Sequence, residues 1–323
     1  MNYFKKLFDF KRTRMIDEAV FFHKPVTLGK AILNFIVVMI ISNIIVGLIQ
    51  AILLVASILS NEEATSALLS DGNIDEFMNS IPNWLGAVEL IISGLFIFCA
   101  IFYCKKYETR KPFTMGLHKN GCVIEYLIGL LVGCGMISIP FLICLAFGAI
   151  KVSFLGFNPI IILFFVGFFV QGFAHNTFVH GYFTVSVARD YAPIVALSLG
   201  SVAFLVFTMA STTITIVSII NIFLVGFFLG IYMFKRGSII GCSAVLTGWS
   251  FLQDSIFSPF SGSYALLSAQ SKVSTIITGG TAGIGGGLVA TGVLILATFI
   301  LLLTKTNKKE VSEFESDFNH SRV

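Results

Sequence analysis

The sequence predicts an all-α membrane protein with about eight transmembrane helices, on the basis of its composition, its long apolar stretches and its charge distribution. Of its 323 residues, 56% are hydrophobic and only 12% are charged, and phenylalanine alone occurs 34 times. A soluble domain of this length is far less apolar. Several stretches also reach the roughly 20 apolar residues that a helix needs to cross a bilayer core. We therefore expect a multi-pass membrane protein.

A basic, amphipathic leader, residues 1–27, precedes the first apolar stretch. Its lysines and arginines are interleaved with phenylalanine and leucine, a pattern typical of a helix on the cytoplasmic membrane surface. It lacks a short apolar core followed by a small-residue cleavage site, so we expect no cleavable signal peptide. Membrane lipids are therefore one expected partner. Nucleic acid is not expected, because the basic residues follow the predicted topology.

The transmembrane bundle is predicted within residues 28–304. The eight spans have approximate bounds 28–59, 84–104, 122–150, 157–188, 192–209, 214–234, 238–257 and 285–304. The connectors include an acidic loop with a short interfacial helix (SALLSDGNIDEFMNSI), a basic segment (KKYETRKPFTMGLHKNG), a short turn at Lys151 and a Gly/Ser-rich loop after span seven. Pro140 should kink span three. The charged tail, residues 305–323, is expected to be disordered and cytoplasmic.

The distribution of basic residues predicts the orientation. With a cytoplasmic N-terminus and eight spans, every one of the 21 lysines and arginines except Lys151 and Lys272 falls on the cytoplasmic side. This matches the excess of positive charge that cytoplasmic loops carry. Seven or nine spans would place the basic tail outside, so we expect both termini to be cytoplasmic.

One polar stretch, QGFAHNTFVHGY at 171–182, interrupts the predicted fourth span. Each polar side chain at membrane depth costs on the order of 2–3 kcal/mol, so such residues usually face a cavity or one another. On a straight α-helix the faces carrying His175 and His180 are about 140° apart, which disfavours a shared metal ion. Six cysteines without a CxxC pair add no metal framework. We expect no metal or cofactor, and the candidate binding residues are Gln171, His175, Asn176, His180 and, from span seven, Asp254.

Five strings, in order between about residues 107 and 291, resemble the motifs of the CPBP family (CAAX-prenyl proteases and bacteriocin-processing proteins, also called Abi). They are QGFAHNTFVHGYF, SLGSVAFLVFT, NIFLVGFFLGIYMFKRGSI, GWSFLQDSIF and TGGTAGIGGGLVAT. The family pattern has paired glutamates and an arginine in the first motif and histidines in the second and third. The resemblance implies a CPBP-like helical bundle in a bacterial cytoplasmic membrane.

The polar residues of the family pattern are replaced in this chain. The paired glutamates fall on His175 and Asn176, and the arginine on His180. The second motif's histidine falls on Thr208. The third motif's histidine and asparagine fall on Leu246 and Ser250, and the glutamate of the Gly-rich segment on Gly285. Scaffold positions such as Gly181, Tyr182, Phe204 and Trp249 are retained. By the resemblance, the reaction centre is lost while the scaffold is kept.

These replacements decide the predicted function. Peptide hydrolysis needs a base within reach of water and donors aimed at the oxyanion. Leu246 supplies neither, and the remaining membrane-depth acids, Glu89, Glu125 and Asp254, lie outside the family's catalytic positions. We expect a pseudoprotease that binds a membrane protein, peptide or lipidated segment, in bacteriocin immunity, peptide maturation or envelope regulation. Polar residues that only join helices, an active endopeptidase with displaced residues, and a transporter or channel are the alternatives.

Overall fold

The computed structural model describes residues 14–21, 26–62, 65–66, 81–117, 121–209, 214–259 and 264–304. The rest of the predicted leader, nearly all of the predicted interfacial helix and the charged tail lie outside these residues. Of the described residues, 79% are helical. Five helical segments within the described residues are long and apolar enough to cross a membrane: Leu28–Leu59, Asn83–Tyr107, Cys122–Ala146, Ile160–Ala188 and Ile216–Arg236. The chain is therefore a predominantly helical membrane protein.

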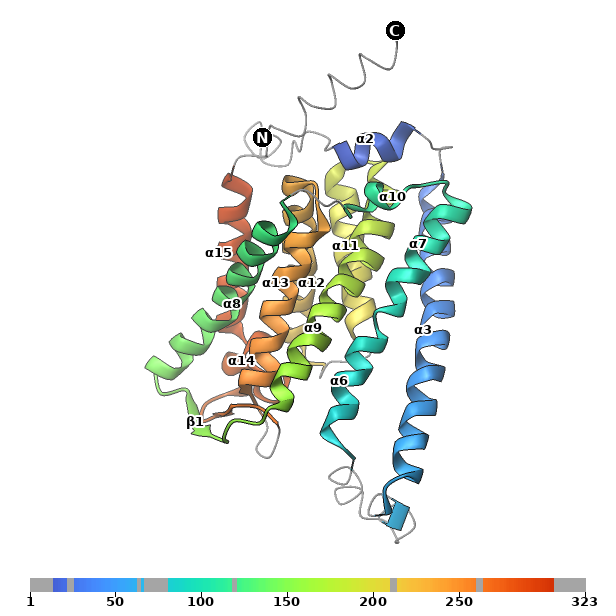
Figure 1. The fold of residues 1–323 in the computed structure, drawn as a ribbon. Coiled ribbons are helices and arrows are strands. Elements are labelled where there is room, and N and C mark those ends of the chain that lie inside the picture. The colour runs from blue at the N-terminus through green and yellow to red at the C-terminus, as the bar shows by residue number, and fades with distance from the viewer. Residues whose placement is uncertain are drawn as a thin grey trace.

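The bundle is built from rod-like helices that run roughly side by side (Figure 1). They are α3 (Leu28–Leu59), α6 (Asn83–Ile92) with α7 (Leu95–Tyr107), α8 (Cys122–Ala146), α9 (Ile160–Asn176), α11 (Pro193–Thr208), α12 (Ile216–Arg236), α13 (Ile239–Phe251) and α15 (Leu288–Leu303). Shorter pieces are α2 (Arg14–Phe21), η1 (Pro112–Met115), α10 (Val185–Ala188), α14 (Thr275–Thr278), η5 (Gly280–Ala282) and η6 (Ile284–Gly286).

Two π-helices extend the helices that carry the polar residues. The first, η2 (Thr177–Thr184), joins α9 to α10 and contains His180. The second, η4 (Leu252–Ile256), continues α13 and contains Asp254. π-Helical turns are rare and occur frequently at functional sites. Both π-helices therefore make the polar residues that they carry candidates for a functional site.

A small sheet closes one end of the bundle, where the sequence predicted only a short turn and an irregular loop. Strands β1 (Ile150–Phe154) and β3 (Leu267–Ser271) pair antiparallel, with Ile150 opposite Ser271. The two-residue β2 (Phe257–Ser258) pairs parallel with β3. The prediction of a turn at Lys151 was wrong. Ile150, Val152 and Phe154 alternate with Lys151 and Ser153, which is the pattern of a strand. Extended backbone beyond the end of a helix also needs hydrogen-bond partners, and β3 supplies them.

Glycines set the closest helix packing. A Cβ on Gly129 would lie 2.2 Å from the Gly241 carbonyl oxygen, and one on Gly133 would lie 2.0 Å from that of Val245. Only glycine lets the α8 backbone come this near to α13, a contact typical of membrane helices. This packing fixes α13 in the interior, where it forms one wall of the main cavity.

Candidate functional site

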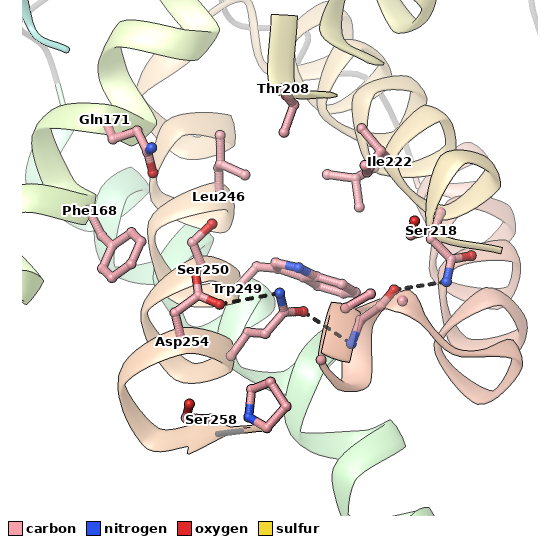
Figure 2. Close-up of a pocket in the computed structure, with 18 of the residues that line it drawn as sticks. Phe168, Gln171, Thr208, Ser218, Ile222, Leu246, Trp249, Ser250, Asp254 and Ser258 are labelled. Atoms are coloured by element: carbon pink, nitrogen blue, oxygen red, sulfur yellow. Dashed lines mark hydrogen bonds between the residues drawn. The ribbon is translucent and has the colours of Figure 1, made fainter. Parts of the chain in front are cut away.

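A cavity of about 480 Å³ lies between α6, α9, α11, α12, α13 and the Gly-rich segment before α15. Its volume falls in the range of small-ligand sites, roughly 300–1,000 Å³. Most of its wall is apolar or aromatic, with Phe164, Phe168, Phe204 and Trp249 among the lining residues. Figure 2 shows Thr208, Ile222, Leu246 and Trp249 around this space.

The cavity gathers most of the positions singled out from the family resemblance. The lining residues include His175 from α9, Thr208 from α11, Leu246 and Ser250 from α13, and Gly285 from η6. Among the predicted binding residues, Gln171, His175 and Asp254 also line it. Asn176 and His180 are not among its lining residues. The structure thus brings together Gln171 and Gly285, which lie 114 positions apart in the sequence, with the predicted positions between them.

The two histidines are oriented differently from the straight-helix prediction. The His175 and His180 rings both contact Phe204, with ring centroids 6.4 and 5.9 Å from it. The cause is η2, in which the Val185 amide donates to the His180 carbonyl. A π-turn brings residues five apart toward one face, so the expected angle of about 140° does not apply.

His180 and Asn176 are packed into the helix bundle beside the cavity. His180 is 1% exposed, its Nδ1 lies 3.3 Å from Thr184 Oγ1, and its Nε2 is buried without a hydrogen-bond partner. Asn176 is fully buried, and its Nδ2 donates to the Gly172 carbonyl at 2.9 Å. This i to i−4 bond satisfies part of the amide within its own helix. Both residues therefore act in packing.

Asp254 lies at the end of the cavity nearest the sheet, in a chain of hydrogen bonds. Gln253 Nε2 donates to Asp254 Oδ1 at 3.4 Å, and Gln253 Oε1 accepts from the Gly285 amide at 3.0 Å. On the other side, Asn221 Nδ2 donates to the carbonyls of Gly285 and Gly287 at 2.8 and 2.9 Å. Figure 2 shows this chain across the cavity floor. It fixes the Gly-rich segment as a wall of the cavity.

Gly285 is required where the Gly-rich segment meets α13. A Cβ at this position would lie 2.1 Å from Gln253 Oε1 and 2.7 Å from Trp249 Cζ2. Neither separation is compatible with van der Waals contact, so any side chain would displace the cavity wall. The position that the resemblance matches to a glutamate therefore has no room for one in this conformation.

His175 and Asp254 do not pair. The structure shows no hydrogen bond or ion pair between them in the part of the chain that it describes. Thr247 Oγ1 donates to the Phe168 carbonyl, which places these two residues at one level. Counting along the antiparallel helices from that level, Asp254 and His175 are roughly 20 Å apart at 1.5 Å per residue. They occupy opposite ends of one elongated cavity.

Tyr264 contributes an aromatic face near Asp254. Its ring stacks on that of Phe164, with centroids 3.6 Å apart and an interplanar angle of 8°. Both residues line the cavity. Burial raises the pKa of Tyr264, and the Asp254 carboxylate raises it further. The phenol is therefore neutral at physiological pH and adds no charge to the cavity.

A second buried polar region was missed from the sequence. Arg110 is 2% exposed and donates to the carbonyls of Gly181 and Tyr182 at 2.7 and 3.2 Å. It also pairs with Glu108 at 3.0 Å, and Glu108 pairs with Arg189 at 3.2 Å. Burial lowers the pKa of Arg189, and the Glu108 carboxylate offsets part of that shift. We call Glu108, Arg110, Ser186 and Arg189 the arginine cluster.

The signal for this cluster lay in the predicted basic connector, where Glu108 and Arg110 are two residues apart. A π-helix leaves carbonyls without the usual i+4 donor, and the guanidinium supplies five donors in a fixed fork. Neither the π-helix nor the fold of the connector onto it can be read from periodicity.

Metal binding finds no support in the residues that the structure describes. Within them, no group of three or more histidine, cysteine, aspartate or glutamate side chains is arranged to hold an ion. Among the described residues that line the cavity, His175, Asp254 and the neutral phenol of Tyr264 are the titratable ones. Chemistry at this site therefore depends on His175 and Asp254 together with neutral hydroxyl and amide groups.

No protein-family model, curated protein or solved structure matches this chain. The resemblance to the CPBP motifs therefore stays a prediction from the sequence.

Proposed function

We propose that this protein binds a peptide or a segment of another membrane protein in its cavity and does not cleave it. In this proposal the chain is a catalytically degenerate relative of the CPBP proteases in a bacterial cytoplasmic membrane. Bacteriocin immunity, peptide maturation and regulation of envelope proteins are the settings that the resemblance implies. A lipidated segment would fit the same apolar cavity.

The observation that carries the proposal is the convergence of the motif positions. His175, Thr208, Leu246, Ser250 and Gly285 come from four separate elements and line one cavity. The resemblance rests on the amino-acid sequence alone. A chance resemblance would scatter such positions over the bundle, so their convergence supports a shared scaffold.

The chemistry of those positions supports binding without hydrolysis. A leucine stands where the pattern has a histidine, and a threonine hydroxyl cannot hold the positive charge that an imidazole would. His175 contacts the rings of Phe204 and Phe207, 6.4 and 4.9 Å away, and has no carboxylate beside it to raise its basicity. A water at this level would meet the His175 imidazole without a carboxylate to orient it.

An active endopeptidase with displaced residues is the second candidate, and Asp254 favours it. A carboxylate in a ligand-sized cavity can in principle act as a general base. The separation of roughly 20 Å along the helix axes weighs against a joint role with His175. Cleavage, if it occurs, would have to use Asp254 with Ser250 or Gln253 at the sheet end of the cavity.

The proposal includes eight membrane crossings with both termini cytoplasmic. Eight helical rods support it: α3, α6 with α7, α8, α9 with α10, α11, α12, α13 with η4, and α15. α11 and α15 are apolar but only 16 residues long. The distribution of lysine and arginine favours this orientation. Cysteines introduced in place of Lys151, which is predicted to be external, and Lys105, which is predicted to be cytoplasmic, test this topology through the side from which each thiol is accessible.

Site-specific photocrosslinking in native membranes tests the function. A photoreactive phenylalanine analogue replaces Leu246, which is 7% exposed and lines the cavity, or Leu131, which is 73% exposed on α8. We expect a discrete polypeptide adduct from position 246 and only lipid adducts from position 131. Equal polypeptide capture at both positions would contradict binding in the cavity.

A cleavage assay separates the two candidates. The co-expressed partner recovered by crosslinking is followed for truncation in cells carrying the wild type, His175→Ala or Asp254→Asn. The binding proposal expects intact partner in all three. Truncation that disappears in either variant would establish the endopeptidase instead.

A further inference from the structure

The sheet end of the cavity contains a carboxylate without a cationic partner. Asp254 accepts only the long bond from Gln253, and no ion pair to it is formed within the described residues. The sequence from Gly237 to Ser271 contains no lysine, arginine or histidine. Among the described residues that line the cavity, the only basic side chain is His175, at the other end. A carboxylate with so few hydrogen-bond donors in an apolar enclosure has a desolvation cost that the protein does not compensate.

Aromatic side chains line the same part of the cavity. Trp249 lies one helical turn before Asp254, and the Phe164 and Tyr264 rings are stacked on one another beside the cavity. Aromatic faces attract cations through their quadrupole, and the attraction strengthens when the pair is removed from water. Carboxylate and aromatic faces together are selective for a positively charged group.

The rest of the cavity is neutral and largely apolar. Between Asp254 and His175 the wall includes Leu246, Ile222, Val225 and Phe204. An elongated ligand with a charged end and an apolar body would match this arrangement. An anionic end would meet a like charge at Asp254 and no lysine or arginine among the lining residues.

From this arrangement we infer that Asp254 forms an ammonium-binding subsite, and that the ligand of the cavity places a primary ammonium group there with its apolar part toward Leu246. The inference rests on the proposed binding function and adds the chemical class of the ligand. In a bound peptide, the ammonium is a lysine side chain or a free N-terminus. An ethanolamine headgroup is the other source of the same chemistry.

Tryptophan fluorescence can report on this subsite. The chain has two tryptophans, and Trp84 is 43% exposed and absent from the cavity lining. In a Trp84→Phe background the signal comes from Trp249 alone. The purified full chain in a neutral detergent is titrated with octylammonium, 1-octanol or octyl sulfate, which share an apolar chain and differ in charge.

We expect octylammonium to change the Trp249 signal saturably and with higher affinity than the other two probes. Asp254→Asn should weaken octylammonium binding at least about tenfold, because a charge-assisted contact is lost, and leave octanol binding unchanged. Asp254→Glu should keep the preference. Glu89→Gln is the matched control, since Glu89 lies at membrane depth but outside the cavity lining. Equal affinities for the three probes, or equal loss in Glu89→Gln, would overturn the subsite.

Two further arms identify the source of the ammonium and separate this inference from the function. An apolar peptide with one lysine should compete with octylammonium, whereas its norleucine analogue should not. Competition by ethanolamine lipid in nanodiscs, without competition by the lysine peptide, would assign the ammonium to lipid. A crosslinked partner without ammonium preference refutes the subsite alone, and ammonium preference without a crosslinked partner refutes the function alone.

Discussion

The arginine cluster and the cavity are both polar regions inside an apolar bundle, yet their hydrogen bonding differs. In the arginine cluster, Arg110 makes hydrogen bonds to Thr114, Glu108, Ser186 and the carbonyls of η2. In the cavity, Asp254 accepts one long bond, and His175 contacts the rings of Phe204 and Phe207. Arg110 is bonded through all three guanidinium nitrogens, although Arg189 Nη1 in the same cluster has no hydrogen-bond partner among the described residues. Asp254 has far fewer donors.

The difference separates structural from functional polarity. A buried charge with a full set of partners stabilises the geometry of the segments that it joins, here the connector and η2. Polar groups that line an open volume without partners cost free energy in the empty protein and can recover it only from a ligand. Residue type alone does not distinguish the two cases, because both use carboxylates and basic side chains.

The largest expected effect is the loss of Arg110. Arg110→Ala should lower the free energy of unfolding by about 3–5 kcal/mol, because it breaks the buried ion pair with Glu108 and removes the guanidinium donors to the Gly181 and Thr114 carbonyls. SDS titration in mixed micelles measures this change. Lys105→Ala, at an exposed position of α7, is the control and should change it by less than about 0.5 kcal/mol. Equal effects would mean that the arginine cluster is not structural.

A smaller loss is expected at the wall of the cavity. Gly285→Ala should destabilise the protein by about 1–3 kcal/mol, because the added methyl group overlaps Gln253 and Trp249. Gly292→Ala is the matched control, since a Cβ there would meet nothing within 4 Å. In the same titration it should be neutral or slightly stabilising. If Gly285→Ala left the free energy of unfolding unchanged, Gln253 and Trp249 would have to shift at little cost.

His180→Phe should be nearly neutral although the residue is fully buried. The change removes an unpartnered Nε2, and Thr184 keeps its bond to the Val179 carbonyl. Replacing a buried polar ring by an apolar one of similar shape costs less than about 1.5 kcal/mol. A loss above 3 kcal/mol in thermal or SDS unfolding would place His180 with the structural group instead.

The smallest stability effect is expected at Asp254. Asp254→Asn should leave the free energy of unfolding of the empty protein unchanged or raise it by up to about 1 kcal/mol, because an unpaired buried charge is removed. The test compares unfolding without ligand in the variant and the wild type. A marked loss of stability would reveal that the carboxylate has a structural partner.

The sequence predicted the helical spans well where apolar length decides them. The predicted span 157–188 corresponds to the continuous helix Ile160–Ala188, and the span 122–150 to α8, which ends at Ala146. Hydropathy reports the length of a span because the bilayer sets it. It carries no information on how a backbone winds inside the bundle, so both π-helices and the new faces of His175 and His180 were not predictable.

The site was predicted in part, for a similar reason. Polar residues at membrane depth are costly to expose to lipid, and His175 and Asp254 line the cavity; their role in binding stays a prediction. His180 and Asn176 carry the same signal but lie outside the cavity lining, packed in the bundle, and His180 Nε2 and Asn176 Oδ1 have no hydrogen-bond partner among the described residues. The distance between His175 and Asp254 depends on the relative levels of α9 and α13, which glycine contacts set and which composition does not reveal.

The mass of the polypeptide crosslinked at position 246 tests the central claim most directly. If the cavity binds without cleaving, mass spectrometry of the adduct will show a partner of full length, in the wild type and in Asp254→Asn alike. A partner truncated in the wild type and intact in Asp254→Asn would contradict the account and establish a protease.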